Sequence, residues 1–131
     1  MRSYDIAVAS LAIGAPIRWT DNAISQHLIP GVTGRQRGVT RRIAHSALVT
    51  LAVVRQLHIL LGLSVRDAVS MAIALLDSSG PGVPGSGQLR VTLDRPALEQ
   101  AIEHRLRDAL ESAPARPRGR PPGRTRGGRV G

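Results

Sequence analysis

Glycine and proline are concentrated in two stretches, and these stretches limit which parts of the chain can build a hydrophobic core. Residues 79–87 contain four Gly and two Pro, a composition typical of a flexible linker. Residues 113–131 contain nine Gly or Pro and almost no apolar side chain, so we expect a disordered tail. Regular structure is therefore expected in residues 1–78, as the main domain, and in residues 88–112, as a smaller element.

The charge is strongly positive and unevenly placed. All 18 basic residues are Arg, against 9 acidic residues, which gives a formal net charge of +9 in 131 residues. GC-rich codons favour Arg, but codon bias alone would spread the charge more evenly. Six Arg and no acid lie in residues 113–131, whereas residues 79–112 are slightly acidic. A polyanion is the natural partner for such a chain.

The scarce residue types exclude several kinds of site. The chain has no Cys, so disulfides, thiolate nucleophiles and cysteine-ligated zinc are excluded. Its aromatic residues are one Tyr and one Trp, which argues against stacking on single-stranded nucleic acid and leaves duplex DNA. The four His lack the spacing of a helical zinc pair, and no Gly-rich phosphate loop is present. We expect no enzyme activity, no cofactor and no metal.

Two short helices are predicted near the N-terminus. Residues 6–13 are mostly apolar, and we expect residues 5–12 to form a short helix that stops at Gly14, which can adopt the positive φ of a helix C-terminus. Pro16 is suited to the first turn of a second helix, which we expect to extend to His27. Two helices joined by a tight turn with Gly match the outline of a helix-turn-helix.

A basic β-hairpin is predicted directly after these helices. Residues 30–43 contain β-branched pairs at 32–33 and 39–40 on either side of a turn between Gly34 and Gly38. Four of the fourteen residues are Arg, and no acid occurs between Asp21 and Asp67. A basic hairpin that follows a helix-turn-helix is called a wing.

Two further helices follow, and the first of them is predominantly apolar. Residues 44–61 are almost long enough to cross a membrane, but Arg55 and His58 lie at the centre. A central Arg costs about 2.5–3.5 kcal/mol on insertion scales, which favours a buried helix and no membrane contact. Gly62 ends this helix, and Ser64 caps a helix that continues to residue 76.

The element at 88–112 is predicted to be a strand followed by a helix. Apolar and polar residues alternate over 88–93, and Asp94 caps a helix with one apolar stripe. These elements must dock either on the first domain or on a second copy, because neither buries its apolar side alone. We hypothesise that a ribbon of paired strands makes a homodimer. A ribbon-helix-helix, with Arg90 and Thr92 in the major groove, is a weaker alternative because its second helix is missing.

The order of these features from Tyr4 to Leu76 resembles the MerR-type winged helix-turn-helix family. The resemblance lies in the opening Tyr4 and Ile6, the turn at Gly14, the Leu-Ile-Pro-Gly step at 28–31, the basic wing and the Leu-Gly-Leu-Ser step at 61–64. It covers more than half of the chain, although the family's long coiled coil is missing. The resemblance implies a plain DNA-binding regulator or architectural factor, similar to short, excisionase-like members.

The second helix supplies the candidate residues for base recognition. Thr20, Ala23, Ile24 and His27 share one face of this helix, and the opposite face is polar. Arg pairs with guanine and Asn with adenine in the major groove, each contact contributing about 1–3 kcal/mol of discrimination. Asp21 would lie near phosphates or orient Arg18, and Trp19 is expected to pack beneath the wing. The candidates on the polar face are Arg18, Asn22, Ser25 and Gln26.

The wing and the tail supply candidate phosphate contacts. Arg35 and Arg37 at the tip of the wing would enter the minor groove or hold its phosphates, and Arg41 and Arg42 would hold the backbone as the hairpin returns. In the tail, the sequence Pro-Arg-Gly-Arg-Pro at 117–121 matches the core of an AT-hook, in which Arg118 and Arg120 would lie in a narrow minor groove. A nonspecific polycationic tail is the open alternative, and both make binding salt-sensitive.

These observations predict a mainly α fold with a small β wing: a winged helix-turn-helix, a helix pair, a C-terminal strand–helix element and a disordered basic tail. The predicted function is sequence-selective binding of double-stranded DNA, in a cytoplasmic, nucleoid-associated regulator of transcription. Two alternatives remain open. One is a protein-interaction adaptor that docks partners on the helices at 44–76, and the other is a nonspecific architectural DNA-binding protein.

Overall fold

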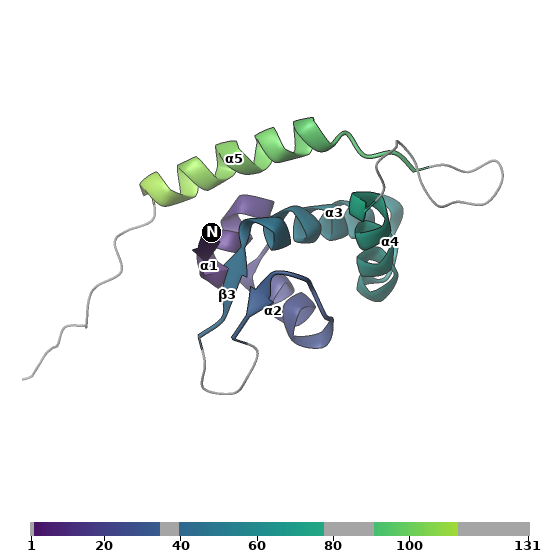
Figure 1. Cartoon of the computed structure of the whole chain (residues 1–131), viewed down its shortest axis with the longest axis horizontal. Coiled ribbons are helices and arrows are strands. Elements are labelled where there is room, and N and C mark those ends of the chain that lie inside the picture. Colours follow the sequence, from purple (N-terminus) through teal and green to yellow (C-terminus); the bar gives the residue numbers. More distant parts are fainter. Residues whose placement is uncertain (1, 35–39, 78–90, 113–131) are drawn as a thin grey trace, which may run out of the picture.

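The computed structural model describes residues 2–34, 40–77 and 91–112, and all statements below concern these residues. They form a mainly helical structure with a small antiparallel sheet, in agreement with the predicted fold class (Figure 1). The helices are α1 (Ile6–Ile13), α2 (Ile17–Gln26), α3 (His45–Leu61), α4 (Val65–Asp77) and α5 (Arg95–Ser112), and the strands are β1 (Ser3–Tyr4), β2 (Val32–Thr33) and β3 (Arg42–Ala44).

The short helix α1 is fixed at both ends by local hydrogen bonds. The Asp5 side chain accepts a 2.9 Å bond from the amide of Val8, so it satisfies one of the free amides of the first turn. Gly14 adopts φ 70° after the last helical residue, and the next amide, of Ala15, donates to the carbonyl of Ser10 at 3.0 Å. This is the Schellman arrangement that only a left-handed residue completes easily. The predicted turn between the first two helices is therefore confirmed.

The helices α4 and α5 are also capped at their first turns by a polar side chain. The hydroxyl of Ser64 accepts from the amide of Asp67 at 3.1 Å, and the carboxylate of Asp94 accepts from the amide of Ala97 at 3.2 Å. Gly62, at φ 71°, ends α3. Each of these helix boundaries was predicted from the capping residue alone.

The sheet has the order β1-β3-β2, and both pairings are antiparallel. Ile43 is the central residue, because it pairs with Tyr4 on one side and with Val32 on the other, and it is completely buried. The hairpin predicted over residues 30–43 is formed by the antiparallel pairing of β2 with β3. Its returning strand begins at Arg42, so the β-branched Thr40 lies outside this strand, and Val39 lies outside the described residues. The strand β1 was not predicted, since two residues are too short to show a pattern.

The helix α3 forms the centre of the core. Its buried residues cover most of its circumference and include Leu48, Leu51 and Val54, none of which is accessible to solvent. Both α4 and α5 pack on it. No helix in the described ranges combines the length and the apolar character needed to cross a membrane.

The helix α5 docks on the first domain of the same chain. It packs along α1 and α3, and Ile102 and Leu106 belong to the same buried cluster as the core of residues 4–75. In Figure 1, α5 runs along one side of α1 and α3, and α2 lies on the other side. Of the two predicted ways to cover the apolar side of α5, docking on the first domain of the same chain is the one observed.

The strand predicted before α5 is not formed in its described part. Val91 makes an isolated bridge, residues 92–94 have no regular secondary structure, and residues 88–90 lie outside the described residues. Ile102 and Leu106 of the apolar stripe are buried where α5 packs on α1 and α3, and Leu110 remains exposed. A paired ribbon between two copies would need both a strand and an unpacked helix, and the described residues show neither.

Candidate nucleic-acid interface

The helix α2 has one buried face and one exposed polar face. Thr20, Ala23 and Ile24 are buried and face α1 and the core, with His27 partly buried beside them. The four residues proposed to contact bases are all exposed, as the helical spacing predicted: Arg18, Asn22, Ser25 and Gln26. The amide and guanidinium groups of this face are thus free to approach a ligand.

A pair of buried hydroxyls fixes the orientation of α2 on α1. Ser10 donates a 2.9 Å hydrogen bond to Thr20, and the hydroxyl of Thr20 donates in turn to the carbonyl oxygen of Pro16 at 3.3 Å. Both side chains are buried. Ser10 was not among the residues predicted to matter, although a single Ser inside an otherwise apolar helix indicates that a polar partner faces it.

An ion pair connects α2 with the hairpin formed by β2 and β3. The guanidinium of Arg41, just before β3, binds the carboxylate of Asp21 on α2. Asp21 was predicted to lie near phosphates or to orient Arg18, and its observed partner is instead Arg41. The root of the hairpin and α2 therefore belong to one surface, in which part of the positive charge of the hairpin is neutralised.

Arg42, the other Arg at this end of the hairpin, contacts β1. Its guanidinium donates to the hydroxyl of Ser3 at 3.1 Å and to the carbonyl oxygen of Ser3 at 2.8 Å. The side chain remains exposed. Arg42 thus connects the central strand β3 to the edge strand β1 through its side chain, and its guanidinium remains exposed to solvent.

Trp19 lies against α3, which corrects the prediction that it packs beneath the wing. The guanidinium carbon of Arg55 is 5.0 Å from the centre of the Trp19 ring, a cation–π distance, and the ring of His58 is 6.2 Å away. The ring nitrogen of Trp19 is buried and has no hydrogen-bond partner among the described residues. Trp19 follows Arg18 by one position, so its side chain turns about 100° away from that of Arg18, toward α3.

The described part of the chain is electrically balanced. It contains nine Arg and all nine acidic residues, so its formal charge is zero. The whole net charge of +9 is carried by residues 35–39, 78–90 and 113–131. Four of the predicted contact residues lie in these ranges, outside the described residues: Arg35, Arg37, Arg118 and Arg120.

No group of three or more His, Asp or Glu that could hold a metal ion occurs among the described residues. A comparison with protein-family models, one with curated proteins and one with solved structures gave no match for this chain.

Proposed function

We propose that this chain is a sequence-selective, double-stranded DNA-binding protein that acts as a regulator of transcription in the nucleoid. The observation that carries the proposal is the ion pair between Asp21 and Arg41. It joins the exposed polar face of α2 to the root of a basic hairpin, so that both elements can meet one duplex. The proposal is in keeping with the resemblance to the MerR-type winged helix-turn-helix.

Base selection is assigned to α2. Arg18 and Asn22 are one helical turn apart and exposed, and a helix fits the major groove with such side chains toward base edges. Ser25 and Gln26, on the next turn, extend the same face. The buried hydroxyls of Ser10 and Thr20 hold this helix in place, which lowers the conformational cost of presenting the face to DNA.

Affinity is assigned to the segments that carry the net charge. Because the described body carries no net charge, most of the phosphate attraction is assigned to Arg35 and Arg37 in the hairpin, to Arg90 and to the six Arg of the tail, with Arg41 and Arg42 at the root of the hairpin beside them. Phosphate contacts position a protein on DNA and carry no sequence information. Selectivity and affinity are thus expected to depend on different residues.

The test is a comparison of two Arg substitutions on a duplex selected from a random library. Arg18→Ala should reduce the difference in binding free energy between the selected duplex and a scrambled duplex by about 1–3 kcal/mol. Salt-dependent binding to both duplexes should remain. The control is Arg66→Ala, which removes an exposed Arg from α4 and should leave this difference unchanged. If the protein shifts no duplex at low salt, the proposal is wrong.

A protein-interaction adaptor is the second candidate, and one observation favours it. Three consecutive apolar residues at the end of α3 are more than half exposed, namely Ile59, Leu60 and Leu61. Exposed apolar patches often mark contacts with other proteins. The same low-salt binding assay separates the two functions, because an adaptor has no need for duplex DNA.

A further inference from the structure

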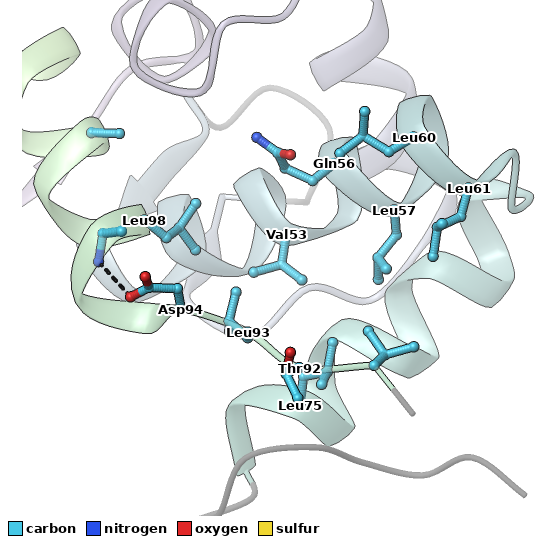
Figure 2. A pocket seen from close by; sticks show the side chains of 13 residues that line it. Val53, Gln56, Leu57, Leu60, Leu61, Leu75, Thr92, Leu93, Asp94 and Leu98 are labelled. Atoms are coloured by element: carbon cyan, nitrogen blue, oxygen red, sulfur yellow. Dashed lines mark hydrogen bonds between the residues drawn. The ribbon is translucent and has the colours of Figure 1, made fainter. Parts of the chain in front are cut away.

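A second candidate site lies away from α2, between the C-terminal half of α3, the end of α4 and residues 91–101 (Figure 2). It is a pocket of about 420 Å³. This volume is within the range of about 300–1,000 Å³ that is usual for small-molecule sites. Figure 2 shows Val53 and Leu57 of α3 on one side and Leu93 and Leu75 on the other.

The lining of the pocket is aliphatic. Ten of its thirteen lining residues are Leu, Val or Ala, and none of the thirteen is aromatic. Leu60, which is 70% exposed, continues the apolar surface to the mouth of the pocket. A flat aromatic ligand would find no ring to stack on, whereas a flexible aliphatic chain would bury its surface against side chains of the same kind.

The polar groups of the pocket determine what head group such a ligand can carry. They come from Gln56, Thr92 and Asp94, and Asp94 is the sole charged residue of the thirteen. One oxygen of its carboxylate caps α5 through the amide of Ala97, and its second oxygen makes no hydrogen bond to another described residue. That second oxygen can accept a hydrogen bond, and it would repel an anion.

We propose that this pocket binds an aliphatic small molecule whose polar end donates a hydrogen bond and carries no negative charge. The aliphatic side chains of the pocket contact the hydrocarbon chain of the ligand, and Asp94, with Gln56 and Thr92, contacts its polar end. Asp94 is exposed at the pocket, and its charge disfavours a fatty acid, although the chain of such a ligand would fit. The proposal is independent of DNA binding, since none of the lining residues belongs to α2 or the hairpin.

The first experiment compares 1-octanol with octanoate by titration calorimetry on the full chain without DNA. We expect 1-octanol to bind at one site and octanoate to bind at least about tenfold more weakly. Ala97→Phe, which places a ring at the wall of the pocket, should weaken 1-octanol by about tenfold or more. Gln100→Phe is the control, because Gln100 is exposed on the same helix and does not line the pocket.

The second experiment tests the role of the carboxylate. Asp94→Asn keeps a good helix cap, so the fold is retained, and it removes the negative charge. Octanoate should then bind to the variant within a few-fold of 1-octanol. Octanoate affinity that stays weak in Asp94→Asn would show that the charge of Asp94 does not select the head group, and would overturn the proposal.

Two other results would also overturn it. One is 1-octanol binding that Ala97→Phe leaves unchanged, since the alcohol would then bind elsewhere. The other is a dimer in sedimentation that Ala97→Phe dissociates, because a second copy of the chain would then cover the pocket. All of these results are obtained without DNA, so a failure here leaves the proposed function untouched.

Discussion

Ser10 on α1 and Thr20 on α2 meet through a 2.9 Å hydrogen bond between their hydroxyls, and the two side chains are 1% and 0% exposed. In a core built mostly from aliphatic groups, this contact requires a particular orientation of the two side chains as well as close packing. Apolar packing alone would allow the two short helices to slide, whereas a buried hydroxyl requires its partner at one position. The pair therefore sets how α2 is presented to solvent.

Thr20→Val should destabilise the protein more than Ser10→Ala does. Val has nearly the shape of Thr but cannot accept the bond from Ser10, so a buried hydroxyl loses its partner, at a cost of about 1–3 kcal/mol in the free energy of unfolding. In Ser10→Ala the hydroxyl of Thr20 still donates to Pro16. Urea unfolding monitored by circular dichroism measures both.

The double variant Ser10→Ala with Thr20→Val provides the control for that comparison. Since it removes both hydroxyls and leaves no unpaired group, it should cost less than the sum of the single variants, with a coupling of about 0.5–3 kcal/mol. Strict additivity would mean that the two hydroxyls do not interact in solution.

Two leucines of α5, one helical turn apart, test whether this helix is part of the core. Leu106 is 3% exposed and Leu110 is 50% exposed. Leu106→Ala should lower the free energy of unfolding by about 2–5 kcal/mol, and Leu110→Ala should change it by about 0.5 kcal/mol or less. Urea unfolding at two protein concentrations measures both effects.

The unfolding transition of Leu106→Ala should stay cooperative and independent of protein concentration, because the contact is made within one chain. A concentration-dependent midpoint would instead restore the hypothesis of a dimer. Deleting residues 79–131 removes α5 and uncovers the surface of α1 beneath it, so this deletion should destabilise α1 and α2 as well.

The helix boundaries could be predicted because they depend on local chemistry. Asp5, Ser64 and Asp94 each cap the helix that follows them, and Gly14 and Gly62 end helices at positive φ. Such bonds join residues three to five positions apart, so the sequence contains both partners within one short window. The exposed face of α2 could be predicted for the same reason, from helical spacing alone.

The contacts between distant elements could not be predicted in this way. Asp21 lies 20 positions from Arg41, and Arg42 lies 39 positions from Ser3. Nothing near Asp21 in the sequence favours Arg41 over Arg18 as its partner. The position of Trp19 against Arg55 and the docking of α5 on α1 likewise depend on which surfaces the fold brings together, and local patterns do not contain that information.

The hairpin should be sensitive to a single methyl group at Gly34, directly after β2. Gly34 has φ 75°, and an added Cβ would lie 2.2 Å from the carbonyl oxygen of Thr40. Gly62 has a similar φ of 71°, with no atom within 4 Å of the added Cβ. Gly62→Ala should therefore cost only the backbone penalty, about 1–2 kcal/mol, and Gly34→Ala should cost about 1–3 kcal/mol more.

Thermal and urea unfolding of the two variants measure this difference directly. Since both substitutions change Gly to Ala at positive φ, the difference isolates the clash with the backbone of Thr40 and Arg41. If DNA binding uses the hairpin, Gly34→Ala should also weaken binding to duplex DNA, and Gly62→Ala should not. Equal stability of the two variants would show that the hairpin opens at little cost.

Asp21→Asn should strengthen binding to duplex DNA of any sequence, if α2 and the hairpin contact it together. The substitution removes the one acidic side chain of α2 and releases the guanidinium of Arg41 from its ion pair. One additional phosphate contact should steepen the dependence of log K on log salt by about 0.9. The fold should change little, because both side chains are partly exposed and such pairs contribute about 0–1 kcal/mol.

Fluorescence anisotropy of a labelled random duplex over a series of KCl concentrations gives both the affinity and the slope. Glu103→Gln is the matched control, because it changes the net charge by the same amount at an exposed position on α5. If the ion pair is what limits binding, Asp21→Asn should steepen the salt dependence and Glu103→Gln should leave it unchanged. Equal changes in both variants would mean that only the total charge matters, and the ion pair between α2 and the hairpin would then have no part in DNA binding.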